Sequence, residues 1–206
     1  MYVVLGGLAM SGPVAVLDAN VLFPASLRDT LLRAAEKKWY EVHWSADIIE
    51  EMRRNLLGLG QATEPQVTKL LNSLNRAFPA ATVIAYQRLI AQMTNDPKDR
   101  HVLAAAVTIQ ANVIVTFNLR DFPASALQPY HIVAQHPDQF LLDLFQQYEE
   151  DMARMLIEQA AFLRKPSQSL GEVLTVLGVL VPRFVQAIRE YLAAHPELMV
   201  PPALQP

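Results

Sequence analysis

The chain contains no cysteine among its 206 residues. This absence excludes disulfide bonds, zinc sites built on thiolates and a cysteine nucleophile, and it gives no sign of a secreted scaffold. Charged residues are also few, at 18%, whereas apolar residues make up 52%. A chain of this length and composition can bury a sizeable core, so we expect a folded globular protein and not a disordered one.

Long hydrophobic runs and a basic leader segment are missing as well. The most apolar stretch, 173–181, is far shorter than the roughly 20 residues that a membrane span needs. The segment from Met1 to Met10 is apolar but has no basic start, so it does not resemble a signal peptide. We therefore expect a cytoplasmic protein with no membrane segment. Met10 is an alternative start to Met1, because the first strand pattern begins just after it.

Short apolar runs alternate with helical patterns up to about residue 135. Continuous apolar strands that alternate with helices are typical of an α/β fold with a mainly parallel sheet. Strands are expected at 14–17, 41–44, 82–84, 112–116 and 130–133. Helices are expected at 27–38, 46–57, 64–78 and 96–110.

The pattern becomes purely helical after residue 136. Helices are expected at 139–163, 169–180 and 182–194, with Pro166 and Pro182 between them. We therefore predict two units, residues 1–135 with a core from about residue 13, and a small all-α appendage at 136–206. A Pro-rich tail follows Val200 and is expected to fray.

Three acidic residues stand next to apolar stretches where hydrophobicity alone would not place them. Asp18 follows the first strand, Asp99 heads the apolar face of the helix at 96–110, and Asp121 follows the strand at 112–116. A buried carboxylate is costly unless it is neutralised, and several that converge are tolerated best around a metal ion. Because ligands bind at the carboxyl ends of strands in open α/β sheets, a shared site is favoured over separate turn or capping roles.

A fourth acid is harder to place from the sequence. Glu51 lies on the flank of the apolar stripe of its helix, whereas Glu50 points closer to solvent. The sequence explains this pair equally well as two ordinary surface acids or as one site residue with a surface neighbour. Asp96 precedes Pro97 and is well explained as a helix N-cap.

The charge balance argues at first against a nucleic-acid partner, because the net charge is −3. The two predicted units differ, however. Residues 1–135 carry 12 basic and 11 acidic residues, whereas residues 136–206 carry 5 and 9. A mildly basic surface around an acidic pocket suits a substrate with a charged backbone, although surface bases are usually only solvated.

Four stretches resemble, in order and in spacing, the motifs of PIN-domain ribonucleases. They are 17–22, 45–54, 96–106 and 115–123, within a likeness that covers about residues 13–135. The resemblance implies a PIN-like parallel sheet flanked by helices, and a Mg²⁺- or Mn²⁺-dependent endoribonuclease that is often the VapC-type toxin of a toxin–antitoxin pair. It assigns the catalytic and metal-binding roles to Asp18, Glu51, Asp99 and Asp121, with polar support from Asn20, Asp96, Thr116 and Asn118.

The helical tail resembles a C-terminal extension found in one branch of such proteins and departs from the compact toxins. The resemblance also implies an RNA substrate, a homodimer and a cognate antitoxin, which would dock on the tail or in a groove between helices.

Other interpretations remain. An aspartyl phosphatase would normally have a second acid two residues after Asp18, where this chain has Asn20. Neither G-x-x-x-x-G-K-S/T nor G-x-G-x-x-G occurs, which removes support for nucleotide hydrolases and dinucleotide binding. The alternative function is a non-catalytic PIN-like interaction or RNA-binding protein whose helical tail binds a partner. We expect His101 and His131 to pack or to lie on the surface and not to do chemistry. Trp39, Trp44 and Phe117 could stack on bases, but packing in the core is the favoured interpretation.

Overall fold

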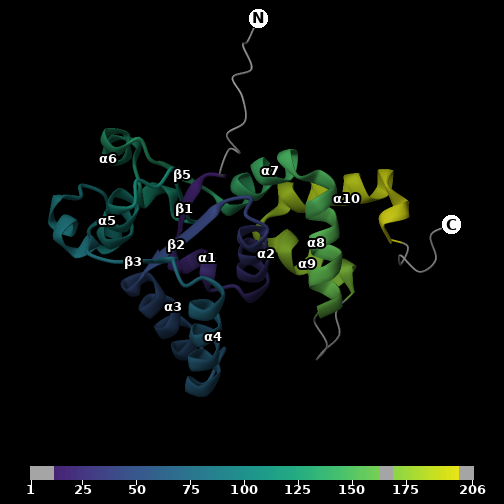
Figure 1. Cartoon of the computed structure of the whole chain (residues 1–206), viewed down its shortest axis with the longest axis horizontal. Coiled ribbons are helices and arrows are strands. Elements are labelled where there is room, and N and C mark those ends of the chain that lie inside the picture. Colours follow the sequence, from purple (N-terminus) through teal and green to yellow (C-terminus); the bar gives the residue numbers. More distant parts are fainter. Residues whose placement is uncertain (1–11, 163–168, 200–206) are drawn as a thin grey trace, which may run out of the picture.

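The computed structural model describes residues 12–162 and 169–199 (Figure 1). Its centre is a five-stranded sheet in the order β3-β2-β1-β4-β5, in which every neighbouring pair of strands is parallel. The strands are β1 (Val14–Leu17), β2 (Glu41–Ser45), β3 (Thr82–Val83), β4 (Val113–Val115) and β5 (Val133–Gln135). The predicted α/β fold with a parallel sheet is confirmed.

The strand order reverses at the central strand, β1. The chain adds β2 and β3 on one side of β1, and then β4 and β5 on the other. Val16 pairs with His43 of β2 and with Ile114 of β4, so the carboxyl ends of β1 and β4 are level. In open parallel sheets, ligands bind at such a reversal. Asp18 and Thr116 both lie there, because each directly follows one of these two strands.

Helices flank the sheet, as expected for strands that are apolar on both faces. Ser45 Oγ accepts a hydrogen bond from Ile48 N at 3.2 Å and caps the helix after β2, as its sequence predicts. The helix before β4 packs against β1, β2 and β4, which brings its first residues close to the strand ends. The flanking helices are α1 (Ala19–Leu22), α2 (Ala25–Glu36), α3 (Ala46–Gly58), α4 (Glu64–Ala77), α5 (Arg100–Thr108) and α6 (Ala124–Leu127).

Several boundaries differ from the prediction. β5 begins three residues later than expected, because a 3₁₀ turn at Gln128–Tyr130 ends in His131 with a left-handed backbone (φ 58°). The helix expected from residue 96 begins as a 3₁₀ turn at Pro97–Asp99, and α5 itself starts at Arg100. The short helices α1 and α6, and a 3₁₀ segment at Tyr86–Gln92, were not predicted, because each is too short to show a hydrophobic period.

Four helices follow the sheet and gather beside α2, at the opposite end of the molecule from α5 and α6 (Figure 1). The single helix predicted at 139–163 is wrong: the chain leaves the helical conformation at Tyr148, whose ring stacks on Trp39 with centroids 4.9 Å apart. Residue 163, Pro166, the region before Gly12 and the tail after Met199 lie outside the described residues. The four helices are α7 (Pro137–Gln147), α8 (Glu149–Phe162), α9 (Leu170–Leu180) and α10 (Pro182–Ala194).

The C-terminal helices share one apolar core with the sheet region. A buried polar contact also joins them to α2: Thr30 Oγ1 and Gln159 Oε1 are 3.0 Å apart, and Gln159 Nε2 donates to Ser26 O at 3.3 Å. The boundary predicted at residue 135 therefore separates two stretches of sequence that pack closely, and their independence as folding units stays a prediction. No helix within the described ranges is long and apolar enough to cross a membrane.

Asp138 is expected to be a strong determinant of how the C-terminal helices assemble. Its buried carboxylate accepts hydrogen bonds from Arg183 N at 3.3 Å and Phe184 N at 2.9 Å, and thus caps α10 from the start of α7. Asp138→Ala leaves both amides unpaired and should lower the free energy of unfolding by about 2 kcal/mol in urea denaturation. Asp151→Ala, at an exposed position of α8, should change it by less than about 0.5 kcal/mol. Equal effects of the two variants would contradict the capping role.

Candidate active site

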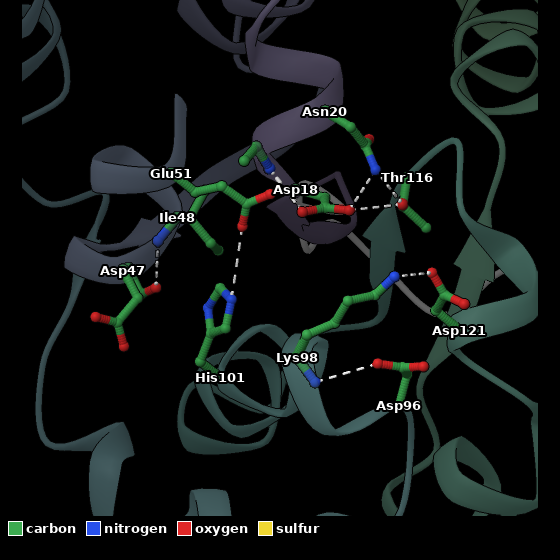
Figure 2. A network of polar contacts seen from close by, with 12 residues as sticks. Asp18, Asn20, Asp47, Ile48, Glu51, Asp96, Lys98, His101, Thr116 and Asp121 are labelled. Carbon is green, nitrogen blue, oxygen red and sulfur yellow. Dashed lines mark hydrogen bonds and ion pairs between the residues drawn. The ribbon is translucent and has the colours of Figure 1, made fainter. Parts of the chain in front are cut away.

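Asp18 is held by hydrogen bonds from three directions at the end of β1. Ala19 N donates to Oδ1 at 2.7 Å, while Asn20 Nδ2 and Thr116 Oγ1 donate to Oδ2 at 2.6 and 2.7 Å. The side chain is 3% exposed. Burial raises its pKa above the usual range, the Thr116 hydroxyl opposes that rise, and the charge of Glu51 adds to it. Asp18 is therefore fixed in one orientation (Figure 2).

Asn20 and Thr116 form the bridge between the ends of β1 and β4. Asn20 Nδ2 also donates to Thr116 Oγ1 at 3.0 Å, and Asn20 Oδ1 accepts from Phe117 N at 3.2 Å. Thr116 Oγ1 in turn accepts from Asn118 N at 3.0 Å. Asn20 and Thr116 thus lie where the sequence placed them, whereas Asn118 takes part through its backbone.

Glu51 faces a cavity of about 470 Å³ from the side of α3. Its Oε2 lies 3.8 Å from His101 Nε2 (Figure 2), whereas the neighbouring Glu50 binds Arg53 Nε at 2.8 Å on the surface. Glu50 also lines this cavity, so the preference for Glu51 stays a prediction, supported by its approach to His101. His101, which the sequence predicted to pack or to lie on the surface, has a side chain that is 15% exposed and lines the same cavity as Glu51. Burial lowers the pKa of the imidazole.

Asp99 is the acid whose surroundings disfavour ionisation most. The residue is 7% exposed, and its Oδ2 has no hydrogen-bond partner among the described residues. Burial raises its pKa to about 7, and the charges of Asp18, Asp121 and Glu51 add to this rise while Lys98 opposes it. The four acids predicted from the sequence therefore act on one another electrostatically.

Asp121 ends a 3₁₀ turn at Leu119–Asp121 and is 6% exposed. Asp96 N donates to Asp121 O at 3.2 Å, which ties the segment after β4 to the start of α5. Asp121 Oδ2 lies 3.4 Å from Lys98 Nζ, and Oδ1 lies 3.5 Å from Arg120 Nε. Asp96 itself is an N-cap, because its Oδ1 accepts from Lys98 N at 3.1 Å. Its side chain therefore has the structural role that the sequence offered as the simpler explanation.

These residues fit a hard divalent cation in their chemistry. All the acidic donors are carboxylates, and two buried oxygens, Asp99 Oδ2 and Asp121 Oδ2, lack a hydrogen-bond partner within the described ranges. Oxygen ligands of this kind are the ones that Mg²⁺ and Mn²⁺ prefer. Among residues 12–162 and 169–199, however, no group of three or more His, Cys, Asp or Glu side chains is arranged so that it could coordinate one metal ion.

Five cavity residues were not singled out by the sequence as part of the site: Asp47, Arg54, Asn55, Lys98 and His101. Arg54 and Lys98 carry positive charge, and nothing in the spacing of Arg54 separates it from other surface bases. Lys98 had a usable signal, because it lies between Asp96 and Asp99 within the motif. The tryptophans behave as predicted, since Trp39 and Trp44 are 5% and 1% exposed and pack in the core.

The raised pKa of Asp99 predicts how the metal-free protein responds to pH. The folded chain holds a proton on Asp99 up to about pH 7, whereas the unfolded chain loses it near pH 4, so stability should fall as pH rises through this window. Asp99→Asn removes the titrating group. In EDTA at pH 8, its melting temperature should exceed that of the wild type by a few degrees, and the difference should shrink at pH 5. A variant that melts below the wild type at pH 8 would show that the charge of Asp99 is compensated.

Comparison with known proteins identifies relatives for both parts of the chain. Residues 14–120 match the model of a PIN domain, and residues 137–190 match the model of a VapC50 C-terminal domain. The chain is 43% identical over 131 residues to the Mycobacterium tuberculosis (strain ATCC 25618 / H37Rv) protein named "Putative ribonuclease VapC50". That match covers 64% of this chain and 75% of the relative. No solved structure matches the chain.

Proposed function

Because the chain belongs to the PIN-domain family, in the VapC-type branch with a C-terminal extension, we propose that it is a metal-dependent endoribonuclease that cleaves RNA phosphodiesters. The observation that carries this proposal is the electrostatic coupling of Asp99 to Asp18, Glu51 and Asp121, which come from the end of β1, from α3 and from the turn after β4. Burial and mutual repulsion there raise the pKa of Asp99 to about 7. Such an arrangement is unfavourable for stability alone and is typical of a functional site.

The four acids would hold Mg²⁺ or Mn²⁺ between them. When bound, such an ion supplies Lewis-acid chemistry, in which a water becomes nucleophilic at neutral pH and charge on the phosphodiester is stabilised. Asp18 is oriented for this role by Asn20 and Thr116. Asp99 and Asp121 each present an oxygen without a hydrogen-bond partner within the described ranges. None of these steps requires a histidine or a cysteine nucleophile.

The cavity wall supplies positive charge for a substrate with a phosphate backbone. Arg54 and Lys98 line it together with four acids, Asp47, Glu50, Glu51 and Asp99. Side chains of this kind attract phosphates and position a nucleic acid without reading its sequence. The proposed substrate class is therefore RNA, held by its backbone across the acidic site.

The family relationship supports a role as the toxin of a VapBC-type pair, with an antitoxin protein as partner. A homodimer remains an expectation of the same kind. In the non-catalytic alternative, the helical tail binds a partner and the four acids have no catalytic role. This alternative predicts that the protein neither binds divalent metal nor cuts RNA.

The direct test is cleavage of end-labelled RNA by the full chain in Mg²⁺, in Mn²⁺ and in EDTA. We expect cutting with metal, none in EDTA, and a loss of at least about 100-fold in Asp99→Asn. Asp29→Asn is the control, because this acid lies on α2 and pairs with Arg33 at 3.0 Å. Metal-independent cutting, or equal loss in the two variants, would contradict the proposed site.

Thr116→Val tests whether the orientation of Asp18 matters to the reaction. The variant keeps the shape of the side chain but removes the 2.7 Å hydrogen bond to Asp18 Oδ2. Loss of a residue that orients a metal ligand typically costs about 10- to 100-fold in activity or metal affinity, so we expect a fall of that size in the cleavage rate. Thr108→Val is the matched control, because Thr108 Oγ1 donates only to Ala104 O of its own helix, at 2.8 Å. A cleavage rate that Thr116→Val leaves unchanged would show that Asp18 needs no such support.

A further inference from the structure

Lys98 carries the one ammonium group that reaches an acid of the site within the described residues. Its Nζ lies 3.4 Å from Asp121 Oδ2, whereas Arg120 Nε lies 3.5 Å from the other oxygen, Oδ1. Figure 2 shows the lysine side chain extended from the 3₁₀ turn before α5 toward Asp121, which follows β4. The ammonium thus bridges the two segments that carry Asp99 and Asp121.

The backbone at Lys98 is held by hydrogen bonds, whereas its side chain is largely exposed to solvent. Lys98 N donates to Asp96 Oδ1 at 3.1 Å, and Asp99 N donates to Asp96 O at 3.0 Å, so the backbone is held in a tight turn. The lysine side chain itself is 62% exposed, whereas that of Asp121 is 7% exposed. A lysine is a flexible point charge on a long stem, suited to neutralise a carboxylate and then to leave it.

The Lys98 ammonium and a divalent cation would compete for Asp121 Oδ2. This oxygen is buried, it has no hydrogen-bond partner in the described ranges, and Lys98 Nζ is its ion-pair partner. A divalent cation held by Asp121 would need the position of the ammonium or would be repelled by it. We propose that Lys98 is a tethered counter-cation, which neutralises the acidic site in the metal-free protein and must be displaced from Asp121 when a divalent ion binds.

This inference rests on the proposed function, because it concerns the same four acids. It assigns Lys98 a positioning role: the residue sets the charge and the order of the metal-free site and thereby weakens its affinity for the ion. Displaced from Asp121, the ammonium stays at the wall of the cavity that it already lines beside Arg54.

The test is titration of metal-free full-length protein with MnCl₂ by isothermal calorimetry. Lys98→Met keeps the length of the side chain and removes its charge, and we expect it to bind Mn²⁺ about five- to tenfold more tightly than the wild type. Lys98→Arg restores the charge and should bind as weakly as the wild type. Arg120→Met removes a charge from the same carboxylate, but from a side chain that is 86% exposed, and should change the affinity by less than about twofold.

A second measurement needs no metal. In EDTA at pH 8, Lys98→Met should melt a few degrees below the wild type, because Asp99 and Asp121 lose their nearby positive charge. An unchanged or higher melting temperature would overturn the role of Lys98 as a neutralising group.

The outcomes separate this inference from the proposed function. Wild-type binding of Mn²⁺ that Lys98→Met does not tighten, or that Arg120→Met tightens equally, would overturn the inference alone. Binding seen only in Lys98→Met would support it in its strongest form. If neither protein binds Mn²⁺, the proposed metal site fails and the counter-cation role fails with it.

Discussion

The mutual repulsion of carboxylates at one edge of a parallel sheet is the constraint on which the rest of this structure depends. Three of them are less than a tenth exposed, and each is made tolerable in a different way. Asp18 receives three hydrogen bonds, Asp99 holds a proton up to about pH 7, and Asp121 faces an ammonium group. The fold supplies the geometry: β1 and β4 end level, and the Asp96 to Asp121 backbone bond holds the third segment beside them.

The C-terminal helices contribute to this arrangement only from a distance. They contact α2 through Thr30 and Gln159, and α2 in turn holds the end of α1 through Arg28, whose Nη1 donates to Leu22 O at 2.6 Å. α1 begins directly after Asp18, so a continuous chain of contacts runs from the added helices to the strand end that carries the site. The extension thus buttresses the PIN-like region.

The sequence predicts the sheet well because parallel strands buried on both faces are continuous apolar runs, which leave a clear pattern. It also predicts Asp18, Asp99 and Asp121, because an acid beside such a run is conspicuous. The break at Tyr148 could not be predicted in this way. It depends on Trp39, a residue more than a hundred positions away, whose ring stacks on that of Tyr148. The residues Arg54 and His101 were missed for the same reason, since only the fold brings them to one cavity.

The three ways of neutralising the acids also divide the site into a rigid side and an adaptable side. Asp18 is bound by groups that cannot leave, because the Ala19 amide belongs to the backbone and Asn20 and Thr116 are locked to each other. Asp99 and Asp121 are neutralised by a proton and by a flexible lysine, both of which can leave when a stronger positive charge arrives. A site built in this way keeps one carboxylate preorganised while the others adapt their charge. Four fully ionised carboxylates without such compensation would oppose the burial that the sheet requires.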